Sequence, residues 1–591
     1  MTVISARRVL LAVAVSVCCM RSAAYAATPV FADSVTPNCH GRGVAGVSCF
    51  TSIQAAVNHA GPPPAVVNVF QGNYFEDVVL NNMGSAIGGS PGDITLQTVN
   101  AAGLPAPGTA TVEGVQSAIG LSGAFNASVT IDGFILTSQV NAAINLFNIT
   151  GDVEIANVSV KQGGFNGIVV GGIATSVDIH DTTALQNSGI GIDVFVRGPV
   201  MLRSVLTNGN GSRGIAVTTL HEVTIETATS SGNSGFGADI SAGAAVMIRK
   251  LTASNNAFGA GVDTPGSITI EDSVANGNNG GDGFDLTSGG AITVYDSTAD
   301  RNKVDGLDAT ASEGITVTRT SASGNGADGM NLFAVLGPTL QHVWVNDNQD
   351  DGIVITTPQT VAIDDASASR NKGHGINISA GQSITIGNSA ADGNAGSGIK
   401  ISSGTDLSID PTSASGNHLN GVDAVLDGHA TVGSLSASDN GGFGFTIQTV
   451  EGLSLSASNL LRNATGLRLA GPERASFAVH CNNIAQNTSA GLESETLATT
   501  NAENDWWGAP TGPQHPSNPG GTGDAVIDGA NGGVGTVDFR PFLFGPFQNV
   551  GVCGGRISQA PAMDTAGLAV CGLALFALGY GVLARRRCAA R

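Results

Sequence analysis

The sequence predicts an all-β fold, a right-handed single-stranded parallel β-helix of 23-residue coils with covered ends. Three observations predict it. Asparagine stands at every 23rd position from residue 187 to 463, glycine follows most of these asparagines four residues later, and an alternating apolar segment follows the glycine. A period of 23 residues is too short for a pair of helices and fits one solenoid coil made of strands and turns. Because a solenoid grows by repetition around one core, we expect one long domain.

The regularly spaced asparagines are predicted to form a ladder along the solenoid. Equivalent residues of neighbouring coils stack about 4.8 Å apart, so each amide can donate a hydrogen bond to the next, as in stacked cross-β strands. We expect this row to be structural and to take no part in chemistry. Its thirteen predicted members are Asn187, Asn210, Asn233, Asn256, Asn279, Asn302, Asn325, Asn348, Asn371, Asn394, Asn417, Asn440 and Asn463.

The rest of each repeat alternates between strands and turns. Glycines such as Gly352 stand where a turn opens into a strand, and a left-handed backbone is easiest for glycine. In the segment that follows, residues 353–355, the first and third residues are apolar, which predicts one buried face. Short upstream strands such as 292–294 complete the coil. This pattern resembles the pectin-lyase-like superfamily of parallel β-helices over residues 48–545, and the resemblance implies that fold.

Both ends of the solenoid carry segments that are predicted to cover it. Residues 27–65 form the N-terminal cap with a short helix over 50–57, residues 66–490 the β-helix, and residues 491–550 the C-terminal cap. An uncovered terminal coil would expose an apolar core and unpaired backbone groups. The C-terminal cap resembles the closing segment of bacterial β-helix surface proteins, and its tryptophan pair at 506–507 is predicted to plug the last coil.

The two terminal segments are typical of targeting signals. Residues 1–26 combine Arg7 and Arg8, an apolar run and a small-x-small cleavage site, which predicts a secretory signal peptide. After a linker at 551–566, residues 567–591 hold an apolar stretch long enough to span a bilayer and then an arginine cluster. This tail resembles the PEP-CTERM and IPTL-CTERM sorting signals of Gram-negative exported proteins. We therefore expect export to the cell envelope or surface, with attachment through the C-terminal segment.

The charge of the body excludes nucleic acid as a natural partner. The chain holds 25 basic and 46 acidic residues, and seven arginines lie in the two terminal segments, which leaves 18 basic residues and a net charge of −28 for residues 27–566. Such a surface repels phosphate backbones. Polysaccharides, cell-surface glycans and cations suit it better, and the membrane is a partner through the tail.

Four of the eight cysteines belong to the body. Cys39 and Cys49 precede the first coil, and Cys481 and Cys553 flank the last part of the chain. In an oxidising compartment these positions predict two disulfides that fasten the caps. No cysteine spacing indicates zinc, and no organic cofactor is expected.

Four aspartates stand one coil apart, each three residues after a ladder position. They are Asp282, Asp305, Asp328 and Asp351, and His374 occupies the next place in the column. Stacked carboxylates raise one another's pKa values. A pair of carboxyl groups on a rigid face, one protonated and one ionised, is what glycosidic hydrolysis requires.

The order of motifs on these coils resembles the polygalacturonases of glycoside hydrolase family 28. The resemblance implies Asp351 as general acid, Asp328 and Asp350 as the residues that activate water, and His374 and Lys400 as residues that hold substrate in the catalytic site. The successive coils read Gly326-Ala327-Asp328, Asp350-Asp351, Gly373-His374-Gly375 and Gly398-Ile399-Lys400. The chain departs from that family at Ala327 and Gly398, where the family has threonine and a uronate-binding arginine.

Three interpretations of the acidic column stay open: polar residues of stacked turns, a bound cation such as calcium, which takes several oxygen ligands, and a glycosidase site. β-Helix enzymes usually interrupt their repeats with loops that wall a cleft, whereas residues 187–463 keep one period. The sequence therefore favours an exported, envelope-tethered protein without catalytic activity that presents a rigid face for adhesion or polysaccharide contact. The alternative is a polygalacturonase-like inverting hydrolase.

Overall fold

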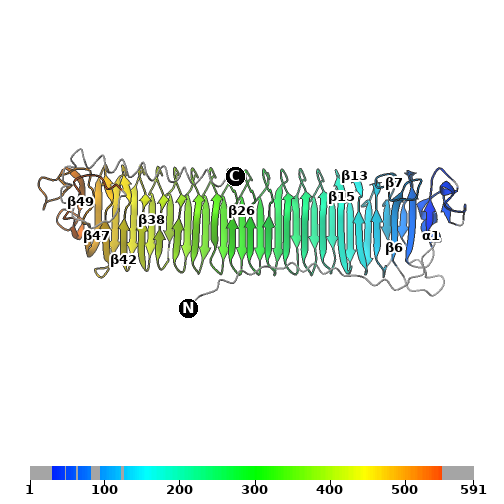
Figure 1. Cartoon of the computed structure of the whole chain (residues 1–591), viewed down its shortest axis with the longest axis horizontal. Coiled ribbons are helices and arrows are strands. Elements are labelled where there is room, and N and C mark those ends of the chain that lie inside the picture. Colours follow the sequence, from blue (N-terminus) through cyan, green and yellow to red (C-terminus); the bar gives the residue numbers. More distant parts are fainter. Residues whose placement is uncertain are drawn as a thin grey trace, which may run out of the picture.

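The protein is one straight rod, a parallel β-helix of about 17 turns (Figure 1). The computed structural model describes residues 29–548 apart from 37, 47, 61–63, 81–92, 122–124 and 403. Every pairing between strands of neighbouring coils is parallel within this part of the chain. The predicted signal peptide, the linker and the apolar tail lie outside the described residues. Within the described residues, no helix is long and apolar enough to cross a membrane.

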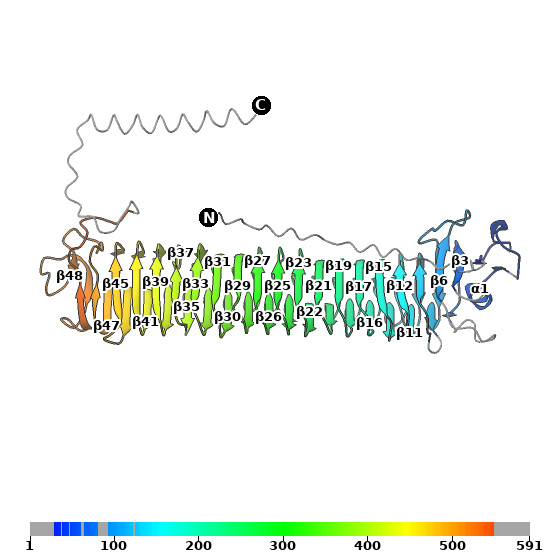
Figure 2. The same ribbon diagram turned by 60° about the horizontal axis from the view of Figure 1, so that its bottom comes forward.

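Each coil has two principal strands, which appear as rows along the rod (Figure 2), and some coils have a short third strand. The A strands follow the ladder turn. They are β5 (Val78–Leu80), β8 (Ile119–Leu121), β11 (Ile144–Ile149), β14 (Ile168–Gly172), β16 (Ile192–Phe195), β18 (Ile215–Thr218), β20 (Phe236–Ser241), β22 (Phe258–Thr264), β24 (Phe284–Ser288), β26 (Leu307–Ala311), β28 (Met330–Ala334), β30 (Ile353–Thr357), β32 (Ile376–Ala380), β35 (Ile399–Ser402), β38 (Val422–Leu426), β41 (Phe443–Thr449), β44 (Thr465–Gly471) and β47 (Ala490–Asn501).

The B strands form the second row. They are β3 (Ala65–Phe70), β6 (Ile94–Val99), β9 (Val129–Asp132), β12 (Asp152–Ala156), β15 (Ser176–Leu185), β17 (Val200–Leu206), β19 (Val223–Thr229), β21 (Val246–Thr252), β23 (Ile268–Glu271), β25 (Ile292–Tyr295), β27 (Ile315–Thr318), β29 (Thr339–Trp344), β31 (Val361–Ser367), β33 (Ile384–Gly387), β36 (Leu407–Ile409), β39 (His429–Gly433), β42 (Gly452–Ser456) and β45 (Ser476–His480). The short third strands are β4 (Gly72–Tyr74), β7 (Ala110–Gly114), β10 (Phe134–Ser138), β13 (Ser159–Lys161), β34 (Ser389–Ala390), β37 (Thr412–Ser413), β40 (Leu435–Ser436), β43 (Asn459–Leu461) and β46 (Asn483–Ala485).

Period-two burial places the core inside the coils, as the sequence predicts. In β30, Ile353 and Ile355 are fully buried while Val354 and Thr356 face outward. The same pattern repeats in β32, which stacks Ile376 on Ile353. One continuous apolar core therefore runs the length of the rod.

The asparagine ladder lies in the turn before each A strand. At each rung, the backbone N–H of one asparagine donates to the Oδ1 atom of the asparagine in the next coil, and at most rungs the side-chain amide does so too. Between Asn348 and Asn371 these distances are 2.9 and 3.0 Å. The residue just before each rung has a positive φ, for example 59° at Arg370 and 67° at Gly393. This left-handed residue turns the chain so that the amide points along the rod.

Glycine is required four residues after most rungs for a different reason from the predicted left-handed backbone. Gly352 and Gly375 are not among the residues with positive φ. A Cβ on Gly352 would lie 2.6 Å from the Nδ2 atom of Asn371 in the next coil, and one on Gly375 would lie equally close to Asn394. The ladder amide fills the space of a side chain, so only glycine fits there.

One predicted rung is wrong. Asn279 is exposed, and its neighbour Asn278 takes the place in the ladder. Asn256 donates its backbone N–H to the Oδ1 atom of Asn278 at 3.0 Å, and Asn278 donates its amide to Asn302 at 2.9 Å. The reason is Gly277, whose φ of 66° fits the left-handed position directly before a rung. One coil is therefore a residue shorter than the period and the next a residue longer.

Parallel pairing extends beyond the predicted limits of the solenoid at both ends. At the N-terminus β1 (Val30–Ala32) pairs with β3 and with β2 (Cys49–Phe50), and α1 (Ile53–His59) packs over this end. At the C-terminus β49 (Gly523–Ile527) and β50 (Val534–Asp538) pair with β47, while β48 (Pro513–Gln514) pairs only with β49. Much of the segment predicted as the C-terminal cap is therefore a last coil.

Buried groups close the C-terminal end. Trp507 is fully buried against the core, and Trp506 bridges to Asn483 of the preceding coil. The ladder continues through Asn487 to the carboxylate of Asp524, which accepts the Asn487 amide at 2.9 Å. An asparagine at the end of the row would have an N–H group without an acceptor, because no further coil follows in the described part of the chain. A carboxylate only accepts hydrogen bonds, so it suits the end of such a row.

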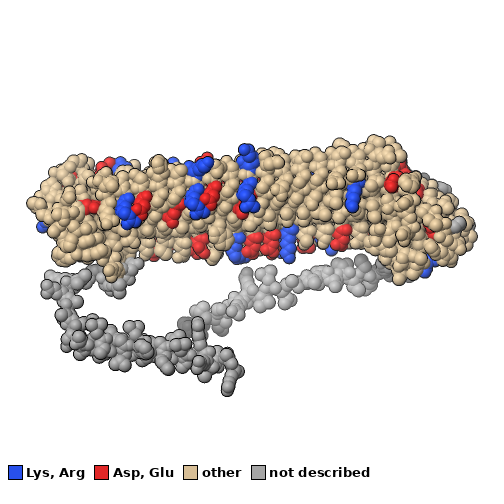
Figure 3. Space-filling model, turned by 90° about the horizontal axis from the view of Figure 1, so that it is seen from above, with Lys and Arg blue, Asp and Glu red and all other residues tan. Residues whose placement is uncertain are grey.

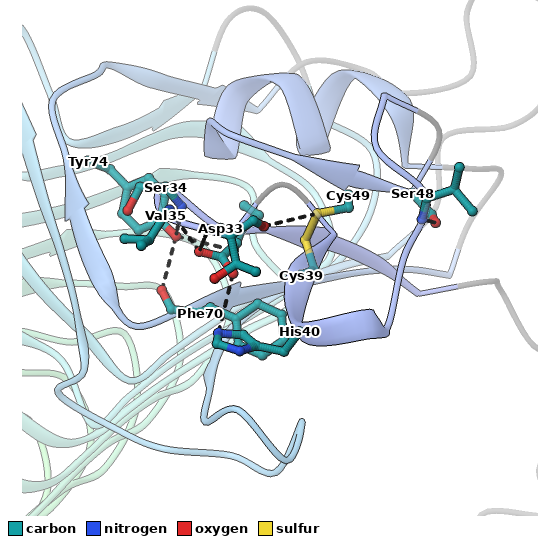
Figure 4. Close-up of a disulfide and its surroundings, with 12 residues drawn as sticks. Asp33, Ser34, Val35, Cys39, His40, Ser48, Cys49, Phe70 and Tyr74 are labelled. Atoms are coloured by element: carbon teal, nitrogen blue, oxygen red, sulfur yellow. Dashed lines mark hydrogen bonds and ion pairs between the residues drawn. A yellow bond between two sulfur atoms is a disulfide. The ribbon is translucent and has the colours of Figure 1, made fainter.

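A disulfide fastens the N-terminal end. Cys39, in the 3-10 turn η1 (Cys39–Gly41), is bonded to Cys49 with an S–S distance of 2.02 Å, and Phe70 belongs to the same buried cluster (Figure 4). Cys481 is also disulfide-bonded. Its predicted partner, Cys553, lies outside the described residues.

Charges alternate along one outward column of the B strands. Register pairs Arg203 with Glu226, Glu226 with Arg249 and Arg249 with Glu271 on four successive coils. The Nε atom of Arg249 lies 2.6 Å from the Oε2 atom of Glu271.

Replacing Asn278 by leucine should lower the free energy of unfolding by about 1 to 3 kcal/mol, because buried N–H groups on both sides lose their partners. The same change at the exposed Asn279 is the matched control and should have little effect. Urea unfolding of the two variants measures the difference. Equal destabilisation by both would show that this rung has been misassigned.

Candidate functional site

The residues predicted to be catalytic lie along one edge of the A sheet. Asp328, Asp351 and His374 precede the A strands β28, β30 and β32, so they stack on successive coils. Asp350 is exposed next to Asp351. Lys400 lies in the middle of β35, one coil beyond His374 and in register with Asn377.

The edge column is itself a hydrogen-bonded ladder. The Oδ1 atoms of Asp282, Asp305 and Asp328 accept the backbone N–H of the next residue in the column at 2.8, 2.8 and 2.9 Å. Asp351 accepts the backbone N–H of His374 at 2.5 Å, and the Nδ1 atom of His374 accepts the backbone N–H of Ser397 at 2.9 Å. Each side chain thus fixes the turn of the following coil.

The predicted general acid has no oxygen directed at a substrate. While its Oδ1 atom is bound to His374, the Oδ2 atom of Asp351 accepts the amide of Asn377 at 2.8 Å. Both oxygens are therefore engaged by N–H donors within the protein. The residue is also buried, with a relative exposure of 8%.

Burial and neighbouring charges raise the pKa values of Asp305 and Asp328 in this column and of Asp308 in the adjacent strand β26. Burial is the main cause at Asp305 and Asp308, where it raises the pKa to about 6. At Asp328 burial and then the charge of Asp305 raise the pKa to about 7. These three carboxyl groups occupy positions that repeat along the sheet.

No group of three or more histidine, cysteine, aspartate or glutamate side chains in the described part of the chain is arranged to hold a metal ion. A groove of about 590 Å³ lies on the ladder turns, lined among others by Arg370, Gly393, Gly416 and Asp439. None of the five residues predicted to form a catalytic site lines it.

The outward face of the A strands from β11 to β38, which we call the A face, holds features that sequence reasoning missed. Carboxylates and amides share its middle column with few cations, for example Asp193, Asp239, Asp285 and Asp308. On the face of the rod seen in Figure 3, charged side chains gather in a few small clusters, and most of the surface between them is uncharged.

Phenylalanine pairs also lie on the A face. The rings of Phe147 and Phe195 have centroids 5.3 Å apart, and those of Phe236 and Phe258 are stacked at 4.7 Å. Their separations in sequence, 48 and 22 residues, differ from the period, so nothing in the sequence alone marked them as pairs. The register of neighbouring strands would have revealed them, because it shows which residues stack in one column.

Comparison with known proteins supports the fold. The model of the right-handed β-helix family matches residues 240–391. The chain has a right-handed β-helix fold. Its pectin-lyase-like architecture is thereby confirmed.

Other comparisons add little about activity. A solved structure, the A-module of the mannuronan C-5 epimerase AlgE4 from Azotobacter vinelandii, is 13% identical, with 72% of this chain and 91% of that chain covered and a TM-score of 0.21. A likeness at that TM-score carries no information on what this β-helix does. No curated protein matches the sequence.

The raised pKa values give stability a definite dependence on pH. Asp305, Asp308 and Asp328 hold protons in the folded state at pH values where the unfolded chain, with an ordinary carboxyl pKa of 3.8, has lost them. Their contribution to stability is complete below about pH 4 and is lost as the pH rises through about 6 to 7. The contribution of these groups should therefore lower the melting temperature as the pH rises from 5 to 8.

Asp328→Asn should raise stability at pH 8 by about 1 kcal/mol after allowance for solvent screening, and it should flatten the pH profile. The amide removes the half-buried charge while its Oδ1 atom still accepts the Asp351 N–H. Thermal melts of the protein and of an Asp427→Asn control, at an exposed turn, measure the slope. A slope unchanged by Asp328→Asn would contradict the assignment.

Proposed function

We propose that this protein is an exported rod, tethered to the cell envelope by its C-terminal segment, that presents the A face to a polysaccharide and catalyses no reaction. The observation that carries the proposal is the hydrogen bonding of the acidic column. Its carboxylates are acceptors for the backbone of the next coil, and Asp351 has both oxygens engaged in this way. Asp282 and Asp305 make the same bonds where no catalysis is predicted.

An inverting hydrolase needs a carboxyl group that donates a proton to the leaving oxygen and a second one that activates water on the opposite side of the sugar. Here Asp328 and Asp351 are stacked neighbours on the same side of one sheet, about 4.8 Å apart along the rod. The regular coils leave no long loop between residues 187 and 463 to enclose a substrate. This geometry supports contact over many coils in preference to a closed reaction site.

The chemistry of the A face suits a glycan. Carboxylate and amide side chains such as Asp239, Asp308 and Asn331 accept or donate hydrogen bonds to hydroxyl groups. Exposed aromatic rings pack against apolar surface, and the axial hydrogens of a pyranose ring provide such a surface. Export and attachment rest on residues 1–26 and 567–591, whose composition favours them.

The purified protein should be retained by at least one polysaccharide in affinity electrophoresis and should release no reducing ends from pectate or any other polysaccharide tested. Asp351→Asn should change neither result. Asp282→Asn, in the same column but outside the predicted catalytic set, is the matched control.

Two outcomes would contradict the proposal. Release of reducing ends that disappears in both Asp351→Asn and His374→Ala, with the circular dichroism unchanged, would establish the hydrolase instead. If no polysaccharide retains the folded protein, the proposal that the A face contacts polysaccharide is wrong.

A further inference from the structure

Each phenylalanine pair of the A face lies over a glycine. Phe147 of β11 and Phe195 of β16 flank Gly171 of β14. A Cβ added to Gly171 would lie 2.2 Å from the ring of Phe195 and 3.1 Å from that of Phe147. The missing side chain lets both rings cover the sheet, and 40% and 38% of these two residues stay exposed.

The second pair repeats this arrangement nearer the middle of the rod. A Cβ on Gly261 would lie 2.9 Å from the ring of Phe236, and one on Gly281 would lie 2.2 Å from that of Phe258. Phe333 shows the contrast: it stands in the same column as Phe195, but its register partners are Thr310 and Thr356. Among the described residues, no aromatic ring stacks on it. Four rings on glycine floors are therefore a particular feature of this region.

A polar stretch of the A face separates the two pairs. Ala216 lies at its centre, in register between Asp193 and Asp239, and its small side chain is buried between them. Arg213 lies beside it, with its Nε atom 2.8 Å from the Oδ2 atom of Asp239. The Oδ2 atom of Asp193 accepts a hydrogen bond from the amide of Asn166 at 3.1 Å, which leaves its Oδ1 atom for another donor.

Strand geometry gives the distance between the pairs. Phe195 and Phe236 are two coils apart, about 10 Å along the rod, and five residues apart along the strand direction, about 17 Å. The line that joins them crosses the strands diagonally and passes over Ala216. This is the length of a short oligosaccharide, with an aromatic platform under each end.

We propose that this diagonal, from the Phe147 and Phe195 pair across Ala216 to the Phe236 and Phe258 pair, binds a neutral polysaccharide chain. The inference rests on the proposed function and gives it a place and a ligand class. Pyranose rings stack on the two platforms, and hydroxyl groups of the sugars between them bind Asp193 and Asp239.

The charges of the site decide between neutral and acidic glycans. Asp193, Asp239, Asp263 and Asp285 follow one another along this part of the A face, and the guanidinium of Arg213 is already paired. A uronate bound over Asp193 and Asp239 would meet their carboxylates, and the guanidinium beside them, that of Arg213, already binds Asp239. A neutral chain meets hydrogen-bond acceptors only.

The test uses the full-length protein and isothermal titration with three probes: cellohexaose and mannohexaose as neutral chains and hexagalacturonate as the acidic one. At least one neutral probe should bind and hexagalacturonate should not. The double variant Phe195→Ala/Phe258→Ala should weaken the neutral probe at least about tenfold, as expected for aromatic residues at the centre of a contact. The double variant with tyrosine at both positions keeps the rings and should bind within about twofold of the unaltered protein.

Phe333→Ala is the matched control, since it removes an equally exposed ring outside the diagonal and should not change binding. Equal loss in Phe333→Ala and in the double alanine variant, or no loss in either, would overturn the assigned site while leaving polysaccharide contact intact. Preference for hexagalacturonate would overturn the ligand class. If the folded protein binds no polysaccharide at all, the proposed function itself is contradicted.

Discussion

The asparagine ladder is the interaction on which the other features of the coil depend. The asparagine of each ladder turn is buried, and its N–H groups have no water to bond to. Asn371 solves this by accepting both N–H groups of Asn348 and by donating its own to Asn394. A left-handed residue must precede the rung so that the amide points along the rod. A glycine must follow four residues later because the amide of the next coil occupies the place of its Cβ atom.

The acidic column extends the same solution to the edge of the A sheet. An aspartate such as Asp305 uses one oxygen to fix the next coil, as an asparagine does, but it adds a charge that burial penalises. The protein accepts that penalty on several successive coils, and at Asp328 the charges of Asp305, Asp351 and Asp350 add to burial and raise the pKa further than at Asp305. Carboxylates with raised pKa values are often taken as a mark of catalysis. Here their repetition and their backbone partners give them a structural explanation.

Much of the architecture could be predicted from the sequence because a period is visible without any knowledge of space. The thirteen-fold spacing, the alternating burial of β30 and the fold class follow from it. Its failure at Asn279 is informative, since counting cannot tell which of two adjacent asparagines follows the left-handed residue, whereas the φ of Gly277 can. The phenylalanine pairs escaped notice for a related reason. Phe195 and Phe236 belong to different columns, and their relation exists only once the coils are stacked.

Regular repetition brings a hazard of its own. Coils that resemble one another can pair in the wrong order during folding, so that one coil is skipped and its two neighbours pair directly. The alternating column on the B strands opposes this error, because leaving out the coil of Glu226 would set Arg203 directly against Arg249, and like charges opposite one another in a sheet are destabilising. Neutral threonines in that column would stack equally well in either order. The charges of these four coils thus oppose any change in the order in which the coils stack.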